Sequence, residues 1–188
     1  MYGIMHRFWL NFAQATKEMD FKRYIRDVKD FPKEGVLFKD ITPLLQDGVA
    51  LTKAAEELVL LVGDVKIDKV VGMESRGFIF GPILAQKLQA GFVPVRKPGK
   101  LPYKKLSESF ALEYGSDTLE MHMDAIKEGE KVLIHDDVLA TGGTASAVAK
   151  LVERAGGEIV QFNFLLELEF LKGRGKIATW PTRSLICY

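Results

Sequence analysis

Two adjacent carboxylates and a turn of small and hydroxyl-bearing residues follow an apolar run in the segment VLIHDDVLATGGT. The acidic pair is Asp136 and Asp137, and the turn consists of Ala140, Thr141, Gly142, Gly143 and Thr144. The glycines let backbone N–H groups approach a bound group, the threonine hydroxyls add donors, and the start of the following helix adds partial positive charge. Such a turn suits a monophosphate.

The acidic pair indicates a second part of the same ligand. Carboxylates repel phosphate, yet they accept hydrogen bonds from vicinal hydroxyls and bind hard divalent cations. A ligand with a ribose diol and a 5′-phosphate would satisfy both parts of the motif. The sequence has no Gly-x-x-x-x-Gly-Lys-Ser/Thr loop, and no Gly-x-Gly-x-x-Gly follows this strand. An ordinary strand-turn-helix connection with solvated acids is the alternative, but the carboxyl edge of an open α/β sheet is where ligands bind.

Cationic side chains follow two further predicted strands. They are Arg76 in the segment ESRG, and Arg96, Lys97 and Lys100 in the segment RKPGK. The planar donor fork of an arginine suits pyrophosphate, and parallel sheets gather such turns along one edge. A surface ion pair and a solvated charge run are the alternatives. The positions favour an anion-binding site.

The remaining chain must supply the elements that position these groups. Apolar runs predict strands over residues 69–73, 92–95, 132–139, 158–167 and 183–187, and helices over residues 49–62, 78–88 and 145–155. Strands that alternate with helices are typical of a right-handed parallel sheet. We therefore expect an α/β fold: a single domain with a central parallel sheet flanked by helices.

The first part of the predicted domain is less regular. Apolar positions Tyr24, Ile25 and Val28 recur at helical spacing, which predicts a helix over residues 21–31 that ends before a proline. Residues 31–45 contain Pro and Gly around a short apolar run, so we expect an irregular segment that covers the core or a flat ligand.

A β-hairpin is predicted between the cationic segment RKPGK and the acidic pair. Residues 110–114 and 119–123 flank the turn sequence Gly-Ser-Asp, and a basic segment over residues 101–107 precedes them. A hairpin behind a mobile basic loop is typical of a lid over a reactive intermediate.

The composition is that of one globular domain. The chain has 188 residues, 47% hydrophobic and 27% charged, and a net charge of +1, which offers no general attraction for nucleic acid. No apolar run is long enough to span a membrane, and a single cysteine with three histidines argues against disulfides and zinc. We interpret residues 1–18 as an extension upstream of a domain over residues 19–188.

The central motif resembles the phosphoribosyl-pyrophosphate motif of type I phosphoribosyltransferases. The segments FPKEGVLFKDITPLL, ESRGFIFGP, RKPGKLP, LEYG and LLELEFLKGR extend this resemblance over nearly all of residues 21–188 and are similar to the adenine branch of that family. One departure is His135, where the family usually has an aliphatic residue. We expect a buried, hydrogen-bonded histidine in the strand rather than a proton-transfer group.

The resemblance implies a reaction and its requirements. The 5-phosphoribosyl group would pass from 5-phosphoribosyl-1-pyrophosphate to N9 of adenine, giving AMP and pyrophosphate in purine salvage. Mg²⁺ would enter with the substrate, held mainly through substrate oxygens and without direct protein ligands. The family further implies a cytoplasmic homodimer whose partners are small molecules, and a small hood formed by N-terminal and late segments.

The resemblance also assigns roles to residues of this sequence. It places the 5′-phosphate on residues 140–144, the ribose hydroxyls on Asp136 and Asp137, and pyrophosphate on Arg76, Arg96, Lys97 and Lys100. Adenine would be bound by Val36, Leu37 and Lys39, largely through main-chain atoms, and by Leu168.

The predicted hairpin carries the candidates for proton transfer. The resemblance assigns the general acid/base role to Glu113, with Tyr114 positioning the reacting groups. Glu108 is the reserve candidate. A solvated hairpin glutamate is the alternative for each, because the role needs a closed lid that desolvates the carboxylate.

Three other functions compete with this interpretation. A phosphoribosyltransferase for hypoxanthine, guanine or xanthine would keep the central motif but would be expected to carry a donor for a 6-oxo group in its base-recognition segment. A non-catalytic sensor of the sugar phosphate usually adds a DNA-binding module, and the sequence shows no basic helix-turn-helix segment. A phosphoacceptor signalling domain would use paired aspartates without the Thr-Gly-Gly-Thr turn.

Overall fold

The computed structural model describes residues 19–111 and 115–188. They fall into two compact units, of which the first ends at Lys53 and the second runs from Ala54 to Tyr188. No helix within these ranges combines the length and the apolar character that a membrane crossing needs. The predicted extension over residues 1–18 lies outside the described residues, and its assignment stays a prediction.

The first unit is built on a two-stranded antiparallel sheet. Its elements are η1 (Phe21–Tyr24), β1 (Arg26–Lys29), β2 (Leu37–Asp40), α2 (Thr42–Gln46) and the first part of α3 (Gly48–Leu60). The predicted helix over residues 21–31 is wrong, because β1 pairs with β2 in a register that sets Val28 opposite Phe38. β-Branched and aromatic side chains favour such a pleated surface. The expectation that residues 31–45 are irregular is wrong where β2 and α2 form.

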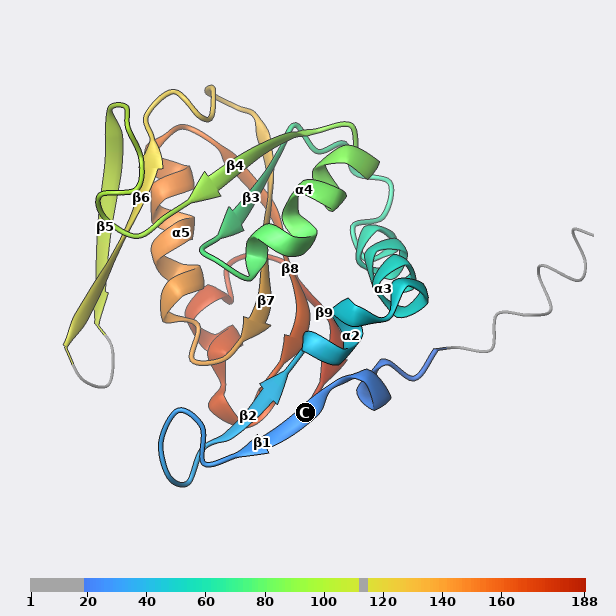
Figure 1. Ribbon diagram of the computed structural model, residues 1–188. Helices are drawn as coiled ribbons and strands as arrows, with labels where there is room; N and C mark the ends of the chain where they lie inside the picture. The colour runs from blue at the N-terminus through green and yellow to red at the C-terminus, as the bar shows by residue number, and fades with distance from the viewer. Residues whose placement is uncertain (1–18, 112–114) are drawn as a thin grey trace, which may run out of the picture. The chain divides into compact units, whose positions relative to one another are not determined.

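The second unit contains the predicted parallel sheet. Its strand order is β4-β3-β7-β8-β9, and all neighbouring pairs are parallel. The strands are β3 (Lys69–Met73), β4 (Gly91–Val95), β7 (Lys131–Leu139), β8 (Glu158–Glu167) and β9 (Thr182–Cys187). Helix α4 (Gly77–Lys87) lies on one face and α5 (Gly143–Arg154) on the other (Figure 1). The predicted α/β fold is confirmed.

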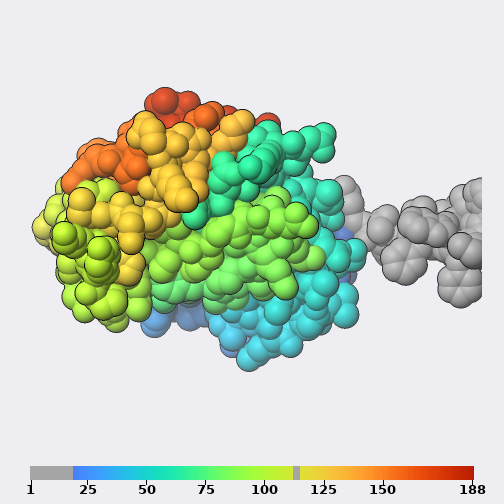
Figure 2. All heavy atoms as spheres, turned by 90° about the horizontal axis from the view of Figure 1, so that it is seen from above, coloured from blue at the N-terminus to red at the C-terminus, as the bar shows by residue number. Residues whose placement is uncertain are grey.

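The predicted hairpin is present beside this sheet. Strands β5 (Lys105–Ala111) and β6 (Ser116–His122) pair antiparallel, and β5 begins inside the segment predicted to be a loop. The hairpin contacts α5, and its first strand, β5, is the yellow-green segment in Figure 2. Met121 of β6 is fully buried, whereas Met123, just after β6, is exposed.

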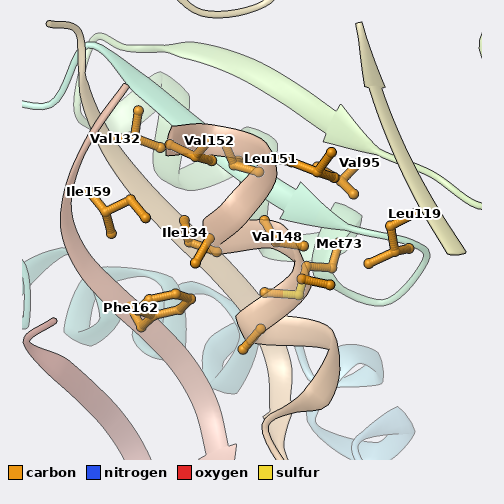
Figure 3. Packing of buried hydrophobic residues seen from close by; sticks show 14 of the residues in the cluster. Met73, Val95, Leu119, Val132, Ile134, Val148, Leu151, Val152, Ile159 and Phe162 are labelled. Atoms are coloured by element: carbon orange, nitrogen blue, oxygen red, sulfur yellow. The ribbon is translucent and has the colours of Figure 1, made fainter. Parts of the chain in front are cut away.

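The core of the second unit lies between α5 and the sheet. Val148, Leu151 and Val152 follow the spacing of one helix face and lie in the same buried cluster as Ile134 of β7 and Phe162 of β8 (Figure 3). Burial of each such side chain contributes about 1.5–3 kcal/mol. This packing fixes the strand and the helix that flank residues 140–144, the turn predicted to bind phosphate and called the phosphate turn below.

His135 lies on the opposite face of β7 and is fully buried, as expected. Its Nδ1 lies 3.0 Å from Oδ1 of Asn163, the residue opposite it in β8, and Asn163 Nδ2 donates to the carbonyl oxygen of Leu58. Nδ1 therefore carries the proton. Burial outweighs the hydrogen bonding to Asn163 and lowers the pKa of His135 to about 4, so the ring is neutral at pH 7.

Replacement of His135 by Leu is expected to flatten the pH dependence of folding. The pKa of His135 rises from about 4 in the folded protein to 6.5 on unfolding, so stability is lost as the pH falls below 6.5. At about 1.4 kcal/mol per pH unit, the natural protein should lose roughly 2 kcal/mol between pH 6.5 and pH 5. Urea unfolding at pH 7 and pH 5 measures this difference. Equal losses in the two proteins would contradict the assignment.

Candidate active site

The phosphate turn connects β7 to α5 at the carboxyl edge of the sheet. Gly142 caps α5 with φ 74°, a left-handed conformation that favours glycine. The first N–H groups of a helix have no partner within the helix, so they are available to an anion. The pocket here has a volume of about 70 Å³. Because small-molecule pockets usually exceed about 300 Å³, it fits one group of a ligand rather than a whole nucleotide.

The residues that line this pocket include the whole predicted phosphate turn. They are Met73, Asp136, Val138, Leu139, Ala140, Thr141, Gly142, Gly143, Thr144, Ala145 and Phe164. The pocket therefore joins one of the two predicted ribose-binding carboxylates to the predicted phosphate-binding backbone.

The two carboxylates have different surroundings. Asp136 forms part of the pocket wall, whereas Asp137 is only 3% exposed and its Oδ2 lies 2.7 Å from Arg76 Nε. Burial and the adjacent charge of Asp137 raise the pKa of Asp136 well above its ordinary value. Burial also raises the pKa of Asp137, although Arg76 opposes this effect. The ion pair thus brings Arg76, which is predicted to bind pyrophosphate, next to the two carboxylates that are predicted to bind ribose.

The start of α4 approaches this pair closely. A Cβ atom at Gly77 would lie 2.9 Å from Asp136 Oδ1 and 3.1 Å from the carbonyl oxygen of His135. Only glycine gives the backbone this proximity without displacing the carboxylate. Gly77 therefore allows the turn between β3 and α4 to lie against the end of β7.

Glu74 organises the remaining predicted cations. Its carboxylate lies 3.3 Å from Arg96 Nε and 3.4 Å from Lys100 Nζ, and it accepts a 2.8 Å hydrogen bond from the Lys97 N–H. Burial raises the pKa of Glu74, but these hydrogen bonds and charges outweigh it and leave the pKa below its ordinary value. Lys97 Nζ also pairs with Asp117 of β6 at 3.1 Å.

Sequence reasoning assigned no role to Glu74. The signal was available, because adjacent parallel strands ending at Met73 and Val95 place the next residue of each strand side by side. Within the described ranges, no group of three or more His, Cys, Asp or Glu side chains is placed to hold a metal ion.

The predicted adenine-binding residues belong to both units. Leu168 follows β8, and its N–H donates to the carbonyl oxygen of Leu139 in the pocket wall at 2.9 Å. In the first unit, Leu37 is 45% exposed, and Lys39 Nζ pairs with Asp27 at 2.6 Å. Val36 is half-buried beside them.

Glu108 has a structural environment in the hairpin. Its carboxylate lies 3.0 Å from Lys150 Nζ and 3.2 Å from Arg154 Nη1, both on α5. These pairs fasten β5 to the helix that begins at the phosphate turn. The preferred candidates Glu113 and Tyr114 lie outside the described residues.

Comparison with known proteins identifies the family. Residues 41–183 match the family model described as phosphoribosyl transferase domain, so the chain belongs to the phosphoribosyltransferase family. Its relatives define the branch. The chain is 62% identical to the adenine phosphoribosyltransferase of Flavobacterium johnsoniae over 90% of this chain and 100% of that protein.

Solved structures agree with this placement. The crystal structure of adenine phosphoribosyltransferase from Thermoanaerobacter pseudethanolicus has a TM-score of 0.88 and 51% identity, and the match covers 90% of this chain and 98% of that one. The enzyme from Saccharomyces cerevisiae, solved with an imino-altritol bisphosphate and adenine, has a TM-score of 0.84 and 42% identity over 94% and 99% of the two chains.

Proposed function

We propose that this protein is an enzyme of purine salvage that transfers the 5-phosphoribosyl group of 5-phosphoribosyl-1-pyrophosphate to N9 of adenine, giving AMP and pyrophosphate. The observation that carries the proposal is the pocket in which a phosphate-binding turn and Asp136 share one wall. A ligand with a 5′-phosphate and a ribose diol matches both. Relatives of 62% and 61% identity, both adenine phosphoribosyltransferases, support the choice of base.

The site residues act on the charges that the reaction creates. Breaking the C1–O bond leaves positive charge on the sugar and negative charge on pyrophosphate. Asp136 and Asp137 are proposed to face the sugar cation. The cations proposed for the leaving group are Arg76, Arg96, Lys97 and Lys100. Charges that are held in place before the reaction need no reorganisation during it. Glu74 and Asp137 hold three of these four cations through their side chains, and Glu74 holds Lys97 through its backbone N–H.

Mg²⁺ fits this site as part of the substrate. The acidic groups beside the cations are engaged in ion pairs, which leaves the oxygens of pyrophosphate and ribose as the better ligands for a hard cation. When bound, the ion would neutralise charge on the leaving group. The residues of the chain orient the sugar and the leaving group around it.

Recognition of the base is assigned to Val36, Leu37, Lys39 and Leu168. Adenine is uncharged, so stacking and backbone hydrogen bonds would bind it. A site that hydrogen-bonds the exocyclic amine leaves polar groups unpaired against a 6-oxopurine, which provides discrimination against hypoxanthine. Glu113 is proposed as the general acid/base at the purine, and Tyr114 as a positioning residue.

A panel of purines tests the function directly. With 5-phosphoribosyl-1-pyrophosphate and Mg²⁺, adenine should be converted to AMP with a kcat/KM at least about 10⁴-fold above that of hypoxanthine, guanine or xanthine. Absorbance and chromatography of the nucleotide measure this ratio. Preference for a 6-oxopurine would identify another purine phosphoribosyltransferase, and binding without turnover would identify a sensor. The homodimer and the cytoplasmic location remain predictions from the family, and light scattering tests the first.

A further inference from the structure

The turn that binds phosphate is in backbone contact with a segment more than thirty residues further along the chain. A Cβ atom on Gly173, the first residue of η3 (Gly173–Ile177), would overlap the carbonyl oxygen of Ala140. A Cβ atom on Gly142 would overlap the carbonyl oxygen of Gly173. Both positions therefore need glycine, and η3 forms the back of the phosphate turn.

An ion pair between the buried carboxylate of Glu167 and the half-exposed side chain of Arg174 holds this segment in place. Glu167, at the end of β8, is 3% exposed and receives hydrogen bonds from Nε and Nη2 of Arg174, both at 2.6 Å. Ser184 Oγ of β9 donates to the same carboxylate at 2.7 Å, and Arg174 Nη1 donates to the carbonyl oxygen of Thr182 at 2.9 Å. A two-point pair of this kind fixes orientation as well as distance.

The network is fully ionised at neutral pH. Burial acts to raise the pKa of Glu167, but the hydrogen bonds from Arg174 and Ser184 outweigh burial and hold the pKa below its ordinary value. The same carboxylate raises the pKa of the Arg174 guanidinium. Arg174 directly follows Gly173, so the ion pair sets the position of the glycine against the turn.

We propose that Glu167 and Arg174 are positioning residues for the 5′-phosphate subsite, and that their ion pair presses Gly173 against Ala140 and Gly142. This inference rests on the proposed function, because it assigns the phosphate turn to the sugar phosphate. The turn then keeps its N–H groups in the binding geometry before the ligand arrives. A displacement of about 1 Å at such a site can cost about 100-fold in rate.

The position of the network predicts a selective effect on ligands. The cations proposed for pyrophosphate follow β3 and β4, and their acidic partners are Glu74, Asp117 and Asp137. The side chains of Glu167 and Arg174 instead bond to each other, to Ser184 and to the carbonyl oxygen of Thr182. Loss of the Glu167–Arg174 ion pair should therefore weaken the binding of ribose 5-phosphate and leave the affinity for pyrophosphate unchanged.

Two glycines of η3 provide a matched test. Gly173→Ala places a methyl group against Ala140, whereas a Cβ on Gly175 meets nothing within 4 Å. Calorimetric titration of the full chain should show the Kd for ribose 5-phosphate raised about 10- to 100-fold in Gly173→Ala and unchanged in Gly175→Ala. The Kd for pyrophosphate should stay within about twofold in both proteins, since neither change reaches its cations.

Arg174→Met and Glu167→Gln test the ion pair itself. Lys66→Met is the control, because it removes an exposed ion pair, the one between Lys66 and Asp68. The first two should reproduce the selective loss of ribose 5-phosphate, and Lys66→Met should not. Unchanged affinity in Gly173→Ala and in whichever pair variants fold would overturn the inference, as would an equal weakening of both ligands. Failure of the unchanged protein to bind ribose 5-phosphate would instead refute the proposed function.

Discussion

Replacement of both central carboxylates by amides, Asp136→Asn with Asp137→Asn, is expected to lower the kcat/KM for AMP formation by about 10³-fold or more. Each carboxylate contributes differently. Asp136 lines the pocket, where it is proposed to accept hydrogen bonds from the ribose and to place negative charge beside the developing sugar cation. Asp137 is buried and holds Arg76, so its loss releases one of the groups proposed for the leaving pyrophosphate.

A matched control uses the same chemical change at the other edge of the sheet. Asp68 precedes β3, pairs with Lys66 and accepts a hydrogen bond from the Lys131 N–H at 3.0 Å. Asp68→Asn keeps an acceptor oxygen and should leave turnover within about twofold of the unchanged protein. Near-normal AMP synthesis by the double amide variant would refute the site.

Asp136→Asn should raise the stability of the folded protein although it lowers the activity. Its pKa is raised on folding, so the folded protein loses stability as the pH rises through that value, and the charged form is unfavourable at pH 7. Asp136→Asn alone should therefore unfold at a higher temperature than the unchanged protein at pH 7 while losing activity. This separation would show that the carboxylate is retained for binding rather than for folding.

The parts of the fold that sequence reasoning predicted are those encoded by local signals. The strand, turn and helix over residues 131–154 each carry their own pattern, because a buried parallel strand reads as a continuous apolar run and α5 repeats apolar residues on one face. The wrong helix over residues 21–31 has another origin. Its spacing fits a helix as well as a strand, and only pairing with residues 37–40 decides between them.

The contacts that were missed join residues far apart in the chain. Arg76 and Asp137 meet because β3 and β7 are neighbours, and strand order is not visible in either segment alone. The contact between Gly142 and Gly173 depends on where η3 returns after β8. The sequence predicted that His135 is buried and hydrogen-bonded, but it did not identify Asn163 of the neighbouring strand as the partner.

Glu113→Gln is expected to lower kcat by about 10²- to 10⁴-fold and to change the Kd for adenine by less than about threefold. The reason is that the amide keeps the size and hydrogen-bonding capacity of the side chain but cannot exchange a proton with the purine. A binding titration with adenine and a steady-state assay of AMP formation separate the two quantities. If kcat stays near normal, Glu113 has no part in proton transfer.

Glu108→Gln is the matched control, because it makes the same chemical change at a described position of β5. Its carboxylate pairs with Lys150 and Arg154, whose side chains are about half exposed, and such pairs are worth only about 0–1 kcal/mol. We expect a small decrease in stability and a kcat within about threefold of the unchanged protein. If Glu108→Gln instead causes the large loss of kcat, the proton-transfer role passes to Glu108, and its ion pairs with α5 must open during each catalytic cycle.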